Sequence, residues 1–435
     1  MMSHLTRMAR KSFPSIGRVA SLARRFSSGR GQSQGRLFEP SWKLGSDFFA
    51  KTWGQMTRPV AETMRDLMLS NLDSVPVPSK KGVFTIADYG TSDGYASMPL
   101  FTTMILSCVS FPLYILNNEE KLRAKHGKEL AIQVIYEDQE RNDFNALFNR
   151  LYDQESYLFQ FNNVYPMATN TNFYKQCVPD GTCDVIFCNA GAHYLRDPEV
   201  KFADAIVHFS PSVTEEELRA FRKEAASQWE DFLVLRAREL KPGGLLVVMS
   251  LSSHDDYRQL VLNPDANKDE SDVIKNQAVT AYRLFVDVEQ AWRELRGRNL
   301  ITEEEYKNYQ MSLVFRGAGE ITKPFHEVNS LVLQSGLSLE FHDQHFHPDP
   351  WKTSWCSLQR QGGVSVPYDE YVTMMFRAVS SVSIHGNLSR MRSEEDKQAI
   401  VEQYYEIFRQ KVASAHPDSY VNDHICSRLV ARKTM

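Results

Sequence analysis

The stretch Ile86-Ala-Asp-Tyr-Gly-Thr-Ser-Asp-Gly94 decides the fold of this chain. The β-rich run that starts at Val83 predicts a strand, and residues from about 95 to 117 predict a helix. A strand, a glycine turn and a helix in this order form the first unit of a doubly wound α/β sheet, where ligands bind at the carboxyl ends of the strands. Gly90 permits close approach of the backbone to a ligand.

The loop alone does not determine which ligand it binds. A Gly-x-x-x-Gly turn also suits a nicotinamide enzyme, and a glycine often marks a simple turn. The loop lacks the Gly-x-Gly-x-x-Gly pattern that admits a pyrophosphate. Asp88 stands too early to cap the following helix and is better placed to bind a cationic or hydroxyl group, as is typical of methyl-donor sites.

A second acidic position follows the run Ile132–Tyr136, which predicts the next strand. Asp138 comes directly after that run. A carboxylate at this strand end can accept hydrogen bonds from both hydroxyls of a ribose. The alternative for Asp138 is a solvated acid with no ligand.

Further strands and a long helix extend the pattern. Cys183–Cys188 predicts a third buried strand, and Thr214 with Glu217 forms a capping box that starts the helix. Lys241-Pro-Gly-Gly244 is expected to end that helix. The apolar run Leu245–Leu251 predicts a central strand covered on both faces.

The second half of the chain reads mainly as helix over residues 271–335, followed by a strand at Leu337–Phe341. Helices are expected over about 368–382 and 393–414, and a last strand over His424–Arg432. Alternating strands and helices predict an α/β fold, with helical insertions packed over the ligand edge of a doubly wound sheet.

Composition excludes several partners. The 435 residues carry a net charge of −4, which argues against nucleic acid or an anionic surface. No apolar run reaches the length of a membrane span, and Met98–Leu116 is expected to be a buried helix.

The six cysteines form no Cys-x-x-Cys pair, so we expect reduced thiols and no metal site. His342-Asp-Gln-His345-Phe-His347 has no evident fourth ligand.

The amino-terminal segment differs in composition from the rest. Residues 1–38 contain eight Lys or Arg residues, many serines and no acid before Glu39. This composition is typical of a mitochondrial transit peptide, with processing near Phe26. The alternative is a disordered basic arm on a cytoplasmic protein.

Together these motifs resemble the SABATH methyltransferases, the salicylate-type carboxyl methyltransferases. The segments that carry the resemblance are the loop Ile86–Gly94, the acidic block Asp138–Phe148 with Asn-Asp-Phe-Asn, the segment Asn172–Tyr174, the segment Ala192–Leu195 and the turn Glu239–Gly244. The Asn-Asp-Phe-Asn block is the most specific, because other doubly wound proteins have no need of it.

The resemblance covers about residues 48–432 and implies a Rossmann-like, doubly wound, seven-stranded methyltransferase sheet with a mostly helical cap. It also implies a dimer that methylates the carboxylate of a small acid, with S-adenosylmethionine as donor and S-adenosylhomocysteine as product. The expected segments are a presequence or arm at 1–38, a core with the donor site at 39–260, cap helices at 261–336 and 363–420, and core segments at 337–362 and 421–435.

The resemblance also assigns site residues. The donor would be bound by Asp88, Gly90, Gly94, Asp138, Gln139, Asn172 and Phe173. His193 and Tyr194 would act as catalytic residues that face the acceptor, and Thr52 and Gln55 would contact the acceptor as well. Tyr194 stands where the family has Trp, Ala96 where it has Asn, and Ala190 where it has Tyr, so the identity of the substrate does not transfer.

Two other functions stay open on the sequence alone. The acceptor could be a phenol, an amine or a protein side chain, in which case His193 would be the natural base. The chain could also be a non-catalytic mitochondrial assembly factor with a vestigial donor site.

Overall fold

The computed structural model describes residues 55–77, 82–109, 130–139, 142–154, 156–196, 198–255, 282–360, 366–420 and 422–434. The basic segment 1–38 and Thr52 lie outside these ranges, and Gln55 is the first residue of helix α3.

A seven-stranded sheet forms the centre of the described chain, in the order β3-β2-β1-β4-β5-β7-β6. The strands are β1 Val83–Tyr89, β2 Ala131–Asp138, β3 Val164–Asn170, β4 Cys183–Asn189, β5 Leu240–Ser252, β6 Leu337–His347 and β7 His424–Lys433. β7 pairs antiparallel with both β5 and β6, whereas the other pairs are parallel. The carboxyl ends of β1, β2, β4 and β5 therefore share one edge. The predicted doubly wound, seven-stranded fold is confirmed.

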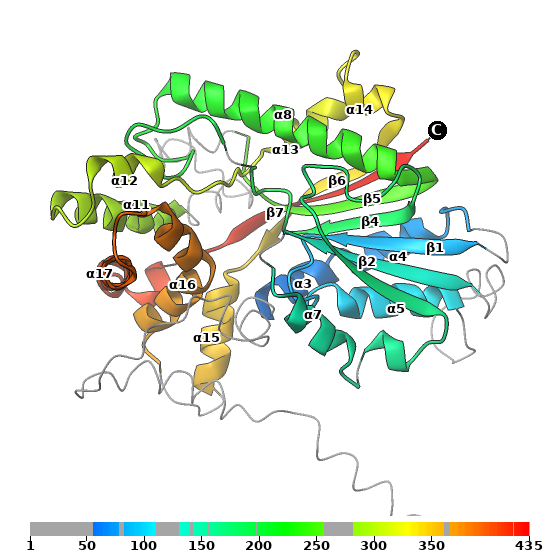
Figure 1. Ribbon diagram of the computed structural model, residues 1–435, viewed down its shortest axis with the longest axis horizontal. Coiled ribbons are helices and arrows are strands. Elements are labelled where there is room, and N and C mark those ends of the chain that lie inside the picture. Colours follow the sequence, from blue (N-terminus) through cyan, green and yellow to red (C-terminus); the bar gives the residue numbers. More distant parts are fainter. Residues whose placement is uncertain are drawn as a thin grey trace, which may run out of the picture.

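Helices cover both faces of the sheet. The α-helices are α3 Gln55–Glu62, α4 Arg65–Leu72, α5 Met98–Val109, α7 Phe144–Leu151, α8 Glu215–Glu239, α11 Tyr282–Gly297, α12 Glu303–Asn308, α13 Ala318–Thr322, α14 Leu331–Gln334, α15 Pro350–Arg360, α16 Tyr368–Asn387 and α17 Glu394–Ala413. In Figure 1, α8 runs over one face, α3, α4 and α5 lie against the other, and α11, α12, α16 and α17 gather beyond one end of the sheet.

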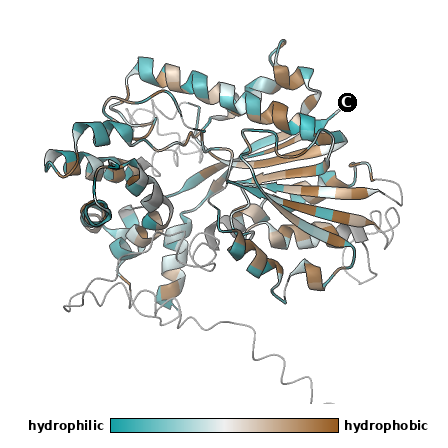
Figure 2. Ribbon diagram, in the orientation of Figure 1, coloured by the Kyte–Doolittle hydropathy of each residue, from teal (hydrophilic) through white to brown (hydrophobic). Residues whose placement is uncertain are grey.

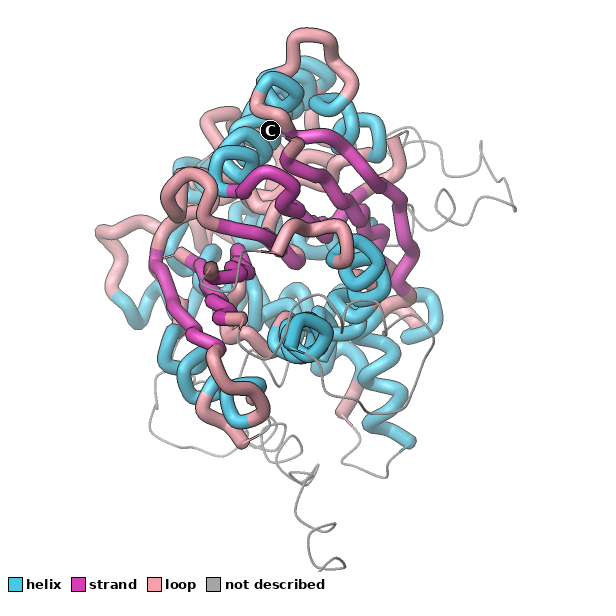
Figure 3. The backbone as a smooth tube through the Cα atoms, turned by 90° about the vertical axis from the view of Figure 1, so that its right-hand side faces the viewer, coloured by secondary structure: helices cyan, strands magenta, loops and turns pink. Residues whose placement is uncertain are grey.

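The sheet is the apolar centre of the molecule, and its strands are largely brown in Figure 2. The rotated view of Figure 3 shows the strands as a twisted layer between helices. One core joins α4 and α5 to residues such as Phe84 and Ile86, and a second core joins α8 to Ala87 and Tyr89. β1 is buried at every residue after Val83 because both faces are covered.

Helix α8 begins as its sequence predicts. The Thr214 hydroxyl accepts the Glu217 N–H at 3.2 Å, and the Glu217 carboxylate accepts the Thr214 N–H at 2.8 Å. These two reciprocal bonds satisfy two donors that a helix start leaves open. The start of α8 is therefore fixed by a local motif.

The helices beyond the sheet have a core of their own. Trp292 of α11 and Tyr404 of α17 are fully buried, with ring centroids 6.0 Å apart. The Trp292 indole donates to the Tyr306 carbonyl at 3.2 Å, and the Tyr404 hydroxyl donates to the Val288 carbonyl at 3.2 Å. The mostly helical cap is therefore a packed body, not a set of loose insertions.

Several elements differ from the sequence prediction. Helix α5 starts at Met98 rather than at 95, and β5 starts at Leu240, so Lys241-Pro-Gly-Gly244 lies inside a strand at an irregularity in the β4–β5 register. The edge strand β3 and helix α15 were not predicted, and residues 309–317 are not helical but irregular, with isolated bridges at Leu313 and Arg316. β3 contains Pro166, which an edge strand tolerates and which hides the strand pattern.

No helix within the described ranges is long and apolar enough to cross a membrane. Within the same part of the chain, no three His, Cys, Asp or Glu side chains are grouped so that they could hold a metal ion.

Candidate active site

The loop after β1 depends on left-handed backbone at alternate residues. Gly90, Ser92 and Gly94 have φ values of +76°, +54° and +73°. A Cβ atom at Gly94 would lie 2.6 Å from the Met98 side chain and 2.9 Å from that of Leu147. Both the conformation and the packing therefore require glycine at position 94.

Ser92 carries a side chain in this unfavourable conformation and is held from two directions. Its N–H donates to Asp138 Oδ2 at 2.7 Å, and its carbonyl accepts from the Asn142 side-chain amide at 2.7 Å. The end of β2 and the start of α7 thereby fix the centre of the β1 loop. This explains physically why Asp138 and the Asn-Asp-Phe-Asn block occur together.

Helix α7 adds a third contact with the loop. Arg150 donates to the Asp93 carbonyl at 3.0 Å and pairs with the Asp93 carboxylate at 2.9 Å. Its guanidinium also lies 4.8 Å from the centre of the Tyr95 ring. Asp143 caps α7 by accepting the Ala146 N–H. We call the contacts of Asp138, Asn142 and Arg150 with the loop the loop clamp.

Buried acidic groups gather where β1 and β2 end. Asp88 is 1% exposed and accepts a hydrogen bond from Ser97. Burial raises the pKa of Asp88 to about 6, against the opposing effect of its hydrogen bonds. Burial, with the nearby charge of Asp138, raises the pKa of Glu137 to about 7. A cationic ligand would stabilise the ionised form of both groups.

Among the side-chain carboxylate and amide groups at this edge, two oxygen atoms lack a hydrogen-bond partner within the described chain. They are Glu137 Oε2 at the end of β2 and Asn189 Oδ1 at the end of β4, and both are shielded from solvent. A buried polar atom without a partner is costly, so a ligand, a water molecule or an ion is expected to satisfy it. These acceptors fit the ammonium and hydroxyl groups of a nucleoside–amino acid conjugate such as S-adenosylmethionine.

The segment after β3 forms one wall of the site. The Asn172 side chain accepts the Tyr174 N–H at 2.9 Å and shapes a turn. The Phe173 ring lies 3.7 Å from the positions that Cβ atoms would take at Gly90 and Gly191. The predicted adenosine-contacting residues are thus beside the β1 loop, although Asn172 uses its side-chain oxygen within its own turn.

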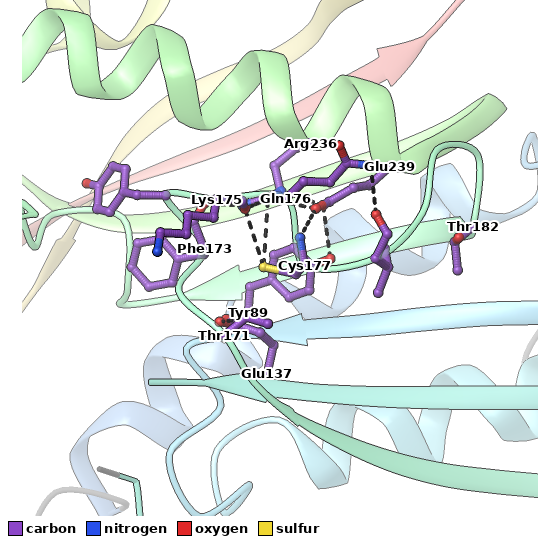
Figure 4. A network of polar contacts seen from close by, with 12 residues as sticks. Tyr89, Glu137, Thr171, Phe173, Lys175, Gln176, Cys177, Thr182, Arg236 and Glu239 are labelled. Atoms are coloured by element: carbon purple, nitrogen blue, oxygen red, sulfur yellow. Dashed lines mark hydrogen bonds and ion pairs between the residues drawn. The ribbon is translucent and has the colours of Figure 1, made fainter. Parts of the chain in front are cut away.

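A buried ion pair holds this wall in place, as Figure 4 shows. Arg236 and Glu239 are both fully buried and pair at 2.7 and 2.9 Å. Arg236 also donates to the carbonyls of Phe173 and Lys175 at 2.6 and 2.9 Å. The Tyr89 hydroxyl donates to Glu239 at 2.9 Å. The pair therefore connects β1, α8 and the Phe173 segment.

His193 and Tyr194 follow β4 at the same edge of the sheet. His193 is 3% exposed, and its Nδ1 accepts the Leu251 N–H at 3.4 Å. Burial, followed by the charges of Arg316 and His424, lowers the pKa of His193 to about 3. Tyr194 is 46% exposed, and its ring centroid lies 4.6 Å from that of His193.

The structure thus places most predicted site residues at one edge of the sheet. Asp88, Gly90, Gly94 and Asp138 belong to the β1 and β2 ends, and Gln139 is exposed with its N–H bonded to Asp138. Nothing is described of Thr52 or of the side chain of Gln55. Sequence reasoning missed Tyr89, Arg150 and Arg236, and gave Asn142 and Glu239 no role. The Arg-x-x-Glu spacing on one helix was the available signal for the ion pair.

Comparison with known proteins identifies the family of this chain. The family described as SAM dependent carboxyl methyltransferase matches residues 49–427. This chain belongs to that family.

The individual relatives that match this chain share little sequence identity with it. Salicylate carboxymethyltransferase from Clarkia breweri is 23% identical over 80% of this chain and 84% of its own length. Gibberellic acid methyltransferase 1 from Arabidopsis thaliana is 24% identical over 44% of this chain and 50% of its own. A methyltransferase from a Fusarium species, LUC1, is 30% identical over 30% of this chain and 35% of its own. The chain thus matches half or less of these last two relatives.

A solved structure shares its fold with almost the whole of this chain. Loganic acid methyltransferase with SAH superimposes with a TM-score of 0.63 at 14% identity, over 90% of this chain and 98% of the other. The likeness confirms the methyltransferase fold.

The loop clamp yields a first prediction. Asn142→Ala removes the donor to the Ser92 carbonyl, and we expect affinity for S-adenosylmethionine to fall about five- to tenfold, since loss of a partly buried hydrogen bond costs about 1 kcal/mol. Isothermal titration measures this. Asn145→Ala is the matched control because Asn145 is exposed on the same helix. Equal affinities of the two variants would contradict the role of Asn142.

The ion pair yields a second prediction. Arg236→Ala leaves Glu239 buried without its partner, and we expect the free energy of unfolding to fall by about 3–5 kcal/mol. Arg238→Ala, two residues further along α8, removes only an exposed 3.4 Å pair with Asp180 and should cost less than about 1 kcal/mol. Urea unfolding of both variants tests this prediction. Similar losses of unfolding free energy would show that the Arg236–Glu239 pair stabilises the protein no more than the exposed pair does.

Proposed function

We propose that this protein transfers a methyl group from S-adenosylmethionine to the carboxylate of a small organic acid, in line, and releases a methyl ester. The donor would supply an electrophilic methyl group on a sulfonium. A carboxylate has a reference pKa near ~4 and is ionised at neutral pH. The acceptor is therefore already a nucleophile and needs no base from the protein.

The protonation state of His193 is the observation that supports a carboxylate as the acceptor. Its pKa of about 3 makes it neutral at physiological pH and a weak base. A phenol or an amine must lose a proton during transfer, which calls for a base with a pKa near the working pH. His193 does not meet that requirement. The low basicity of His193 therefore favours a carboxylate acceptor over a phenol or an amine.

His193 is suited to orient an anion instead. Since Nδ1 accepts a hydrogen bond from Leu251, the neutral ring carries its proton on Nε2. An Nε2–H group can donate to one carboxylate oxygen without transferring its proton. Tyr194 stands beside it as a second donor. Holding the other oxygen in line with the methyl group can supply ~7–11 kcal/mol of the rate enhancement.

The donor would be bound by the residues at the β1 and β2 ends. Asp88 and the neighbouring acceptors suit the methionine ammonium group, and the backbone at Gly90 permits close approach. Asp138 and Gln139 are proposed to hold the ribose, and Asn172 and Phe173 the adenosine. Buried acceptors that lack partners would be a needless cost in a vestigial site, which disfavours a non-catalytic assembly factor.

Two further proposals concern the whole protein. The basic, acid-poor composition of residues 1–38 supports import into mitochondria, and the dimeric character implied by the SABATH resemblance supports a homodimer. Import by isolated mitochondria tests the first proposal, and light scattering of the purified protein tests the second.

The proposed reaction gives a third prediction. With methyl-labelled donor, benzoic, salicylic or octanoic acid should yield label that mild base releases as methanol, whereas phenol and benzylamine should not be labelled. Asp138→Ala should lose the rise in melting temperature that saturating S-adenosylmethionine gives the unaltered protein. Base-stable label on phenol or benzylamine would contradict a carboxylate acceptor. Absence of any thermal shift would contradict donor binding.

The low pKa of His193 gives a fourth prediction. A histidine with a pKa of about 3 stays neutral as pH falls from 8 to 6, so kcat/KM for the acid at saturating donor should be flat over that range. His193→Gln keeps a hydrogen-bond donor and should retain this flat profile at a lower rate. An inflection near pH 6.5 that disappears in His193→Gln would show that His193 acts as a base.

A further inference from the structure

Arg316 is a buried cation behind the His193 segment. Its residue is 4% exposed, and no carboxylate lies within ion-pair distance of it in the described ranges. Glu320 is the nearest acid along the chain, but it pairs with Arg222 at 2.9 Å and caps the Gly317 N–H at 3.0 Å. The guanidinium of Arg316 therefore has no carboxylate in direct contact within the described ranges, and the charge of Glu320 acts on it only at longer range.

The hydrogen bonds of Arg316 go to neutral acceptors. Nη1 donates to the Ala192 carbonyl at 2.8 Å, and Nη2 donates to the Ala225 carbonyl of α8 at 3.1 Å. Nε is shielded from solvent and has no acceptor among the described residues. The guanidinium lies 5.3 Å from the Trp229 ring. Arginine is seldom buried without an anion, because removal of its charge from water is costly.

The hydrogen bond from Arg316 to Ala192 is one of three that fix the backbone carbonyls of three consecutive residues, Ala192, His193 and Tyr194. The His193 carbonyl accepts the Val314 N–H at 2.8 Å, and the Tyr194 carbonyl accepts the Tyr174 hydroxyl at 2.5 Å. The Arg316 carbonyl in turn accepts the Ser252 hydroxyl at 2.6 Å, at the end of β5. Arg316 thus connects the segment that presents His193 and Tyr194 to α8 and to the sheet.

We propose that Arg316 determines specificity for anionic acceptors: its buried charge attracts the acceptor carboxylate, and its bond to Ala192 positions His193 and Tyr194. The proposal rests on the proposed function. A carboxylate bound in front of His193 would add a second negative charge near Arg316, since Glu320 is already paired with Arg222. An uncharged acceptor, or the methyl ester product, would gain nothing from it. The same charge would therefore favour binding of the acid and release of the ester.

The test compares an acid with its own ester. Binding of the acid that the enzyme methylates fastest, and of its methyl ester, is measured by titration in the presence of S-adenosylhomocysteine. Arg316→Gln removes the charge but keeps an amide that can donate to Ala192. We expect the acid to bind about tenfold more weakly, the ester to bind within twofold of the unaltered enzyme, and the affinity for S-adenosylhomocysteine to be unchanged.

Two further variants keep the test decisive. Arg316→Lys retains the charge and should restore most of the acid affinity, even if Arg316→Gln folds poorly. Arg222→Gln removes a partly exposed cation that pairs with Glu320 and should leave the ratio of acid to ester affinity unchanged. Equal weakening of acid and ester in Arg316→Gln, or no weakening of either, would overturn the proposal. If the unaltered enzyme methylates no acid at all, the proposed function itself fails.

Discussion

Ser92 adopts a left-handed backbone conformation although it carries a side chain, and the rest of the site depends on the two hydrogen bonds that hold it there. Asp138 holds its N–H and Asn142 holds its carbonyl, so the loop after β1 is fixed by the strand and helix that follow it in the chain. A loop held in this way presents its backbone in one arrangement before a ligand arrives. Such preorganisation reduces the conformational entropy lost on binding.

The same edge of the sheet concentrates polar groups that the protein itself does not satisfy. Asp88 and Glu137 are buried carboxyl groups with raised pKa values, and Asn189 has an acceptor atom without a partner in the described chain. Behind them, the Arg236–Glu239 pair is fully satisfied and holds the Phe173 wall. The supporting ion pair is therefore satisfied within the protein, whereas the strand ends keep acceptors that a ligand could satisfy.

Much of this arrangement could be predicted from sequence because it depends on local signals. The β1 loop, Asp138 and the capping box of α8 are short patterns with a direct structural meaning. The role of Asn142 could be noticed as part of a motif but not explained, because its partner Ser92 lies 50 residues away. The partners of Arg316, Ala192 and Ala225, are backbone carbonyls, which leave no mark on the sequence. β3 escaped prediction because Pro166 interrupts the strand pattern, which only an edge strand tolerates.

We propose that the preorganised β1 loop forms the donor site together with the β2 end and the Phe173 segment. Hydrogen–deuterium exchange of the full chain with and without S-adenosylhomocysteine tests it most directly. Residues 90–94 should exchange slowly even without ligand, because Gly90, Thr91 and Ser92 donate to Glu137 and Asp138. Ligand should add protection there, at residues 137–139 and at residues 171–177. Rapid exchange of the loop with no ligand-induced protection in these segments would contradict the account.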